Sequence, residues 1–294
     1  AVSLLPRVLG KSLPEQLSAV GMLDLNGAIQ YSNYELEADV NAVSNLGKAH
    51  AKVSMTKLNQ PKLATYTGDV VLEDFHIGNI IGQKNIGKTS LNLFIDGQGF
   101  DSKSLNTIIS GDVYAFEFNG YNFRDIIIDG NLKLPYYKGF LSSKDPNALL
   151  DFDGIIDFSS KVKSYNFKAD IEHLNLRALK LVKDSIGDFK GNIQLVASGN
   201  TLNDFAGTVH VTDAIYKNSK DQYYFSNFEL KSSFDAENVR TIEMNSPDIV
   251  NGYVRGNFQV NQVKDIVENA LGSIYTNYSP NKLKPGQFLD FDFD

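Results

Sequence analysis

Apolar and polar residues alternate one by one along most of this chain, in short runs that a glycine or a turn opens. Gly130, for example, is followed by Leu132 and Leu134, with Asn131 and Lys133 between them. A two-residue period places apolar side chains on one face of a β-strand and polar side chains on the other. Glycine at the start of a run supplies backbone geometry that other residues resist. The pattern therefore predicts a chain built mainly of strands.

The runs begin near Gly21 and continue to the C-terminal end, which predicts roughly fourteen to sixteen strands of about five to eight residues. The clearest hairpin joins residues 34–42 to residues 49–55 through a turn at 45–47. Most connections are too short for a crossover helix, so the sheet is expected to be mainly antiparallel. No linker rich in Pro, Gly or Ser interrupts the pattern. We therefore expect one continuous domain over residues 1–294.

Three stretches are predicted to interrupt the strands as short helices, near residues 14–20, 101–109 and 263–275, and the second also fits a crossover connection. Residues 174–188 fit a helix and an extended chain equally well. The third helix is the best supported, because its apolar residues recur at helical spacing: Ile266, Val267, Ala270, Leu271 and Ile274.

The composition excludes several classes of function. A net charge of -7 with scattered Lys and Arg argues against a nucleic-acid surface, which needs a basic stripe. The absence of cysteine excludes disulfides, thiolate metal sites and a cysteine nucleophile. The N-terminal apolar patch is too short to span a bilayer. Both ends look cut, so we expect a segment of a longer protein whose membrane anchor lies outside these residues.

One stretch matches a phosphate-binding pattern: Gly82–Thr89 reads GQKNIGKT. That motif needs a strand before it and a helix after it, so that loop amides and the helix N-terminus meet the phosphates. The residues after Thr89 alternate as a strand does. A polar hairpin turn is therefore the favoured interpretation.

An acidic cluster comprises Asp145, Asp151, Asp153 and Asp157. A calcium loop would need a terminal glutamate and tighter ligand spacing. We therefore interpret these residues as carboxylates of a solvated turn and of an outer strand face.

No catalytic or metal site is predicted. The histidines are far apart and are expected on the surface: His50, His76, His173 and His210. Neither a nucleophile elbow nor an HExxH motif occurs, and no two carboxylates make a defensible acid and base pair. Asn277-Tyr278-Ser279 fits a glycosylation acceptor, but such short matches are common by chance. We expect no enzymatic activity, no cofactor and no metal.

The apolar face of the strands is either sealed in a closed core or left open. Periodicity alone favours a closed core, because a sandwich or barrel buries the same stripe. Two features favour an open sheet: many inward positions are medium-sized aliphatics with few bulky partners, and the chain ends are strands. An open apolar face needs something to cover it.

Three passages resemble the TamB family of AsmA-like proteins, in the form seen in Bacteroidetes. They are Gly99–Ser159, Ser246–Val260 and Glu268–Asp294, and the similarity extends over most of the chain from about Gly68. It is most specific where Gly139, Phe140, Asp145, Pro146, Asn147 and Asp153-Gly154 follow one another in the family's order.

The resemblance implies a long antiparallel sheet curled into an open groove, a β-taco or repeating β-groove, with an apolar concave face and a few short helices. It implies a periplasmic protein anchored in the inner membrane by a segment not present here. The implied partners are phospholipid acyl chains and, through regions outside this chain, an outer-membrane barrel of the Omp85 type, similar to TamA. The implied role is conduction of phospholipids between the inner and outer membranes.

The apolar residues expected to line this groove share one parity along their strands. They are Val70, Leu72, Leu91, Leu93, Ile95, Ile126, Ile128, Leu132, Leu134, Ile156, Phe158, Phe167, Ile171, Ile193, Leu195, Val209, Val211, Phe228, Leu230, Val254, Phe258 and Val260. A second hypothesis is a periplasmic chaperone or scaffold whose open strand edge assists the assembly of outer-membrane β-proteins.

Overall fold

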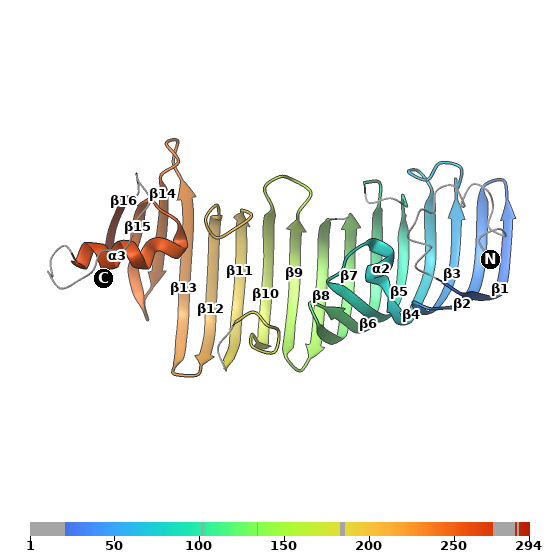
Figure 1. The fold of residues 1–294 in the computed structure, drawn as a ribbon, viewed down its shortest axis with the longest axis horizontal. Helices are drawn as coiled ribbons and strands as arrows, with labels where there is room; N and C mark the ends of the chain where they lie inside the picture. The colour runs from blue at the N-terminus through green and yellow to red at the C-terminus, as the bar shows by residue number, and fades with distance from the viewer. Residues whose placement is uncertain (1–20, 101–102, 134, 183–185, 273–285, 287) are drawn as a thin grey trace. The chain divides into compact units, whose positions relative to one another are not determined.

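The computed structural model describes residues 21–100, 103–133, 135–182, 186–272, 286 and 288–294. In this part of the chain sixteen strands form one sheet, and each strand is hydrogen-bonded to the next one in the sequence (Figure 1). Successive strands are antiparallel from β1 to β8 and from β11 to β16. Within the described residues β1 and β16 do not pair, so the sheet is not closed into a barrel. The predicted mainly-β, antiparallel fold is confirmed.

The chain divides into two compact units, residues 1–155 with 172–183 and residues 156–171 with 184–294. The first unit holds β1 (Leu23–Ser32), β2 (Glu35–Ser44), β3 (Gly47–Thr56), β4 (Thr65–His76), α2 (Ile77–Ile81), β5 (Ile86–Gln98), β6 (Asn106–Phe118), β7 (Tyr121–Lys133) and β8 (Tyr136–Asp145). Two strands have residues in both units, β9 (Ala148–Asp157) and β10 (Ser164–Asn175).

The second unit holds the remaining elements. They are β11 (Gly187–Ser198), β12 (Ala206–Asn218), β13 (Gln222–Phe234), β14 (Arg240–Ser246), β15 (Val250–Asn257), the 3-10 helix η3 (Val260–Gln262), α3 (Val263–Gly272) and β16 (Phe288–Phe293).

The number of strands agrees with the prediction, but most strands are longer than expected, at ten to thirteen residues. β-Bulges account for part of the difference, because each inserts a residue and shifts the alternation without ending the strand. One bulge lies in β4 between Leu72 and Phe75, where Asp74 has φ 47°. Another lies in β12, where Asp213 has φ 51°. Aspartate tolerates this left-handed conformation better than most residues do.

The helix predictions had different outcomes. The helix expected near 101–109 is wrong, because β6 begins at Asn106 and places Ile108 and Ile109 on opposite faces. The helix expected near 263–275 is confirmed as α3 over Val263–Gly272. The helix expected near 14–20 lies outside the described residues. In the ambiguous stretch 174–188, β10 ends at Asn175 and β11 begins at Gly187.

The Gly82–Thr89 stretch is not a phosphate-binding loop. The helix α2 precedes it and the strand β5 begins within it at Ile86, which is the reverse of the order that a phosphate site requires. Gly82 ends α2 with φ 70°. The predicted turn is confirmed.

Among the described residues, no helix combines the length and apolarity needed to cross a membrane.

Candidate functional site

The register of the first unit gathers aliphatic side chains on one face of the sheet, here called the apolar face. Residues directly opposite each other in adjacent antiparallel strands project to the same side. One row across β1 to β7 reads Leu25, Ala42, Ala49, Leu72, Leu91, Val113 and Ile126. The next row, across β1 to β8, reads Gly27, Val40, Ala51, Val70, Leu93, Gly111, Ile128 and Leu141. Neither row contains a polar side chain, but on β8 the buried Ser143 lies opposite Ile126 and ends the first row.

Most residues predicted to line the groove are only half-buried. Such intermediate exposure holds for Val70, Leu93, Ile95, Ile126, Ile128, Leu132, Ile156, Phe167, Ile193, Leu195, Val209, Val211, Phe228, Leu230 and Val260. Five others are buried: Leu72, Leu91, Ile171, Val254 and Phe258. Phe158 is exposed, and Leu134 lies outside the described residues. Whether these side chains contact a lipid remains a prediction.

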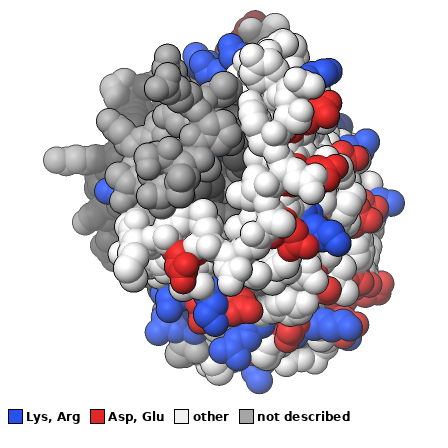
Figure 2. Space-filling view, turned by 90° about the vertical axis from the view of Figure 1, so that its right-hand side faces the viewer, with Lys and Arg blue, Asp and Glu red and all other residues white. Residues whose placement is uncertain are grey.

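The opposite face of the first unit is polar. One of its rows holds four charged residues, a serine and two exposed phenylalanines, and reads Asp39, Lys52, Asp69, Phe94, Ser110, Asp129 and Phe140. Figure 2, an end-on view from the side on which β1 lies in Figure 1, shows Lys and Arg side chains mixed with Asp and Glu, with no field of a single sign. Ion pairs such as Lys48 to Glu73, with Nζ to Oε2 at 3.2 Å, are exposed and contribute little stability.

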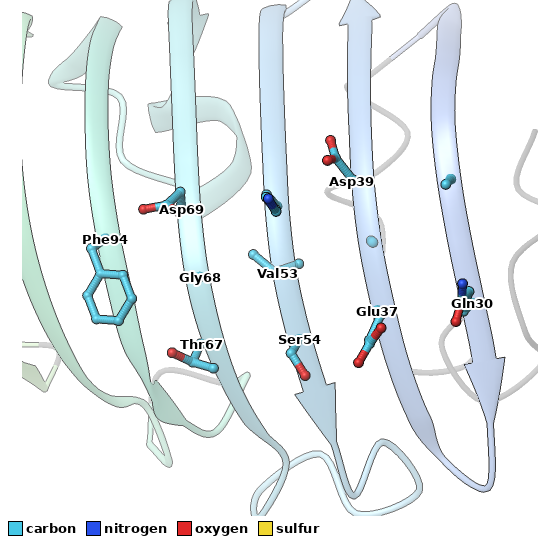
Figure 3. Close-up of a pocket in the computed structure, with 12 residues that line it drawn as sticks. Gln30, Glu37, Asp39, Val53, Ser54, Thr67, Gly68, Asp69 and Phe94 are labelled. Carbon is cyan, nitrogen blue, oxygen red and sulfur yellow. The ribbon is translucent and has the colours of Figure 1, made fainter.

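A shallow depression lies over β1 to β5 (Figure 3). Its polar lining comes from the polar face and includes Glu37, Asp39, Lys52 and Asp69, and Phe94 closes one side. The carboxylates are accompanied by a lysine, and the described residues contain no cluster of three potential metal ligands. The depression therefore gives no sign of a cation site.

Glycines on the apolar face keep strands close together. Gly68 has φ 144°, and a Cβ there would lie 2.1 Å from the carbonyl oxygen of Lys52. Gly111 has φ 139°, and its Cβ would lie 2.3 Å from the carbonyl oxygen of Asn92. Only glycine adopts this conformation without strain. The regular glycines of the sequence therefore serve strand packing as well as turns.

Tyr137 covers a pair of glycines on the apolar face. Gly130 and Gly139 are directly opposite each other, and a Cβ on either would meet the phenol group of Tyr137 within 2.9 Å. The hydroxyl of Tyr137 donates to the carbonyl oxygen of Phe140 at 2.7 Å. Burial, followed by the charges of Asp129 and Asp153, raises the pKa of Tyr137 to about 12. The phenol is therefore a neutral part of the apolar face at physiological pH.

A buried polar network joins β7 to the turn between β8 and β9. Asp145 is 1% exposed, and its carboxylate accepts hydrogen bonds from the hydroxyl of Tyr121 at 2.6 Å, the amide of Arg124 at 3.0 Å and the amide of Asn147 at 2.8 Å. The side chain of Asn147 accepts in turn from Nδ2 of Asn175 at 3.0 Å. The expectation that Asp145 is a solvated turn residue is therefore wrong, because neighbouring strands supply its donors.

The second unit, taken by itself, also has an apolar face. One row reads Leu195, Val209, Leu230, Met244, Gly252 and Phe293, and the next reads Ala197, Gly207, Ser232, Ile242, Val254 and Phe291. Near β14 and β15 the face is covered by α3 (Figure 1). Ile266 of α3, which is 8% exposed, forms a buried cluster with Val254 and Phe258. These two predicted groove residues therefore pack against protein in this structure.

A buried arginine lies beside this cluster. Arg240 is 3% exposed and donates to the hydroxyl of Ser232 at 3.0 Å and to the carbonyl oxygens of Leu202 at 2.9 Å and Phe205 at 3.2 Å. Its guanidinium carbon also lies 6.0 Å from the ring centroid of Phe258. Burial lowers the pKa of Arg240, although an arginine remains charged at neutral pH.

Sequence reasoning missed Asp145 and Arg240 as organising residues. Arg240 carries a weak signal, because it occupies an apolar-face position two residues before Ile242 and four before Met244. Of the histidines, His50 and His210 lie on the polar face and are bonded to asparagines, His50 Nδ1 to Asn41 Oδ1 at 3.0 Å and His210 Nε2 to Asn227 Oδ1 at 2.6 Å.

Comparisons of this chain with protein-family models, with curated proteins and with solved structures gave no match.

Proposed function

We propose that this chain is a segment of a bridge-like protein that conducts phospholipids across a cell envelope, with acyl chains lying on the apolar face. The observation that carries the proposal is the intermediate exposure of aliphatic rows that run from strand to strand. A soluble domain ordinarily seals such rows in its core. A face that is aliphatic but incompletely covered is suited to an apolar ligand.

The physical basis is the cost of exposing acyl chains to water. Each methylene costs about 0.8 kcal/mol, so exposing a phospholipid with about 30 of them to water would cost on the order of 25 kcal/mol. Rows of similar aliphatic side chains offer nearly equal contacts at each strand. A lipid could therefore slide from one strand to the next without a deep free-energy minimum.

The sequence resemblance to the TamB family agrees with this proposal and adds its setting. In that setting the protein is periplasmic, is anchored in the inner membrane through a segment outside this chain, and meets an outer-membrane barrel through other regions. The two-membrane setting, the family membership and the barrel partner are parts of the same proposal.

The direct test is lipid extraction from the purified chain followed by mass spectrometry. Phospholipids should co-purify in stoichiometric amounts and should be lost when lysine replaces Ile128 on the apolar face. Purified chain that is folded and free of phospholipid, and that takes none up from vesicles, would contradict the proposal.

A second candidate is a scaffold that adds strands of client proteins to a sheet edge. It is favoured by β1, in which nine of ten residues are exposed and whose ladder partner among the described residues is β2. Photo-crosslinking from Ile29 would separate the candidates. Protein adducts on β1 would favour the scaffold, and lipid adducts would favour the conduit.

A further inference from the structure

On the apolar face of the second unit, buried polar side chains appear on β13 and β14. On β11 and β12 it presents half-buried aliphatics such as Leu195 and Val209. On β13 and β14 three polar side chains occupy the same face and are almost completely buried: Ser232 at 2%, Arg240 at 3% and Ser246 at 0% exposed. On this part of the face, polar side chains therefore alternate with the aliphatic Leu230, Ile242 and Met244.

Each of these polar side chains is satisfied by protein. The hydroxyl of Ser232 donates to the carbonyl oxygen of Phe205 at 2.8 Å, and that of Ser246 donates to the carbonyl oxygen of Asn227 at 2.8 Å. Arg240 binds Ser232 and the loop 199–205 through the contacts described above. A sliding acyl chain would gain nothing from these groups and could not replace their hydrogen bonds.

Immediately beyond this point, α3 occupies the apolar face. Ile266 packs against Val254 and Phe258, and the partly buried Val263 and Leu289 complete the contact. The loop 199–205 also holds the start of the helical segment, because Asn203 Oδ1 accepts a hydrogen bond from the amide of Val260 at 2.9 Å. The loop therefore links Arg240 on one side to the helical segment on the other.

We propose that α3, held in place by Arg240 and the loop 199–205, is a built-in stop that keeps acyl chains off β14 and β15. On β14 and β15 the helix covers the face of the sheet that lipid would cover on β11 to β13. This inference rests on the proposed function of the apolar face. It adds that in the second unit the lipid-accessible part comprises β11 to β13 and ends where α3 begins to cover the face.

The absence of cysteine from the sequence makes the test direct, because any introduced thiol is unique. Single variants Leu230→Cys and Val254→Cys place a thiol on each side of the boundary. Without lipid, the thiol at 230 should react with a water-soluble maleimide at least about tenfold faster than the thiol at 254. Phosphatidylethanolamine should protect position 230 and should leave the slow rate at 254 unchanged.

Lipid contact is mapped with phosphatidylethanolamine that carries a diazirine in one acyl chain. Adducts are expected on β11 to β13 and not on β14 or β15. Ile266→Asp should detach α3, raise the labelling rate at 254 to that at 230, and extend the adducts onto β14 and β15. Val196→Asp, at a side chain that is 48% exposed on the opposite face of β11, is the control and should change neither result.

A milder variant covers the case in which Ile266→Asp does not fold. Asn203→Ala removes only the acceptor for the Val260 amide and should raise labelling at 254 by about threefold. Wild-type adducts on β14 and β15 as abundant as those on β11 to β13 would overturn the stop and leave the lipid function standing. A different result would refute the lipid function and this inference with it. In that case no adducts form and lipid does not protect position 230, while position 254 stays shielded.

Discussion

Ile127 and Ile128 are neighbours in β7 but project to opposite faces of the sheet. Ile128 lies between Gly111 and Leu141 on the apolar face, whereas Ile127 lies between Asp112 and Ser142 on the polar face. Ile127 is 43% exposed, and Ile128 is half-buried. The pair offers two isoleucines, adjacent in sequence, that project to opposite faces of the sheet.

Ile128→Lys should therefore abolish lipid binding, and Ile127→Lys should not. A charge on the apolar face must be solvated where an acyl chain would lie, so phospholipid affinity should fall at least about tenfold, or about 1.4 kcal/mol. Fluorescent phospholipid titration of the two variants measures this. Equal affinities in two folded variants would contradict the assignment of the apolar face.

Gly68→Ala should destabilise the first unit. The added Cβ would collide with the carbonyl oxygen of Lys52, and alanine resists a φ of 144°. We expect a loss of about 1 to 3 kcal/mol in the free energy of unfolding. Thr67→Ala, at the exposed preceding position, is the control and should cost less than about 1 kcal/mol. Urea titration followed by circular dichroism gives both values.

Asp145→Ala should cost about 3 kcal/mol or more, because it leaves the Tyr121 hydroxyl and the amides of Arg124 and Asn147 without their acceptor. Asp151→Ala, at an exposed carboxylate in β9, should change stability by less than about 0.5 kcal/mol. Thermal unfolding compares the two variants. Similar melting temperatures would show that the network is not important for stability.

Arg240→Met should destabilise the second unit by about 2 to 3 kcal/mol, since two carbonyl oxygens and a serine hydroxyl lose their donor. Arg255→Met removes an exposed ion pair with Asp235, in which Nη2 lies 3.0 Å from Oδ2, and should cost less than about 1 kcal/mol. Chemical denaturation measures both. A larger loss in the free energy of unfolding for Arg255→Met than for Arg240→Met would contradict the order that burial predicts.

The carboxylate of Asp204 should make the loop 199–205 sensitive to acid. Hydrogen bonds from the amide of Asn200, then from the hydroxyl and amide of Thr201, lower its pKa from 3.8 to about 2. A lowered folded-state pKa stabilises the protein above pH 4, and this contribution is lost as pH falls from about 4 to about 2. The stability difference between wild type and Asp204→Ala should therefore shrink over that interval. A difference independent of pH would contradict the assignment.

Local patterning was sufficient to predict the strands, their antiparallel pairing and α3. It failed near 101–109 because Leu105, Ile108 and Ile109 imitate helical spacing, although β6 places Ile108 on the polar face. It also predicted strands that are too short, since a bulge such as that at Asp74 changes the phase of the alternation. The chemistry of Asp145 was missed because its donors come from Tyr121 and Arg124, more than twenty residues away.

Between bulges, the order of the residues alone settles which side chains share a face, because a two-residue period is a local property of the extended backbone. It could not determine how much of that face the protein covers. Only the tertiary structure showed that Val254 and Phe258 lie beneath α3 and that Arg240 is buried beside them. Coverage depends on contacts between segments far apart in the chain, and these contacts cannot be inferred from the alternation along a single strand.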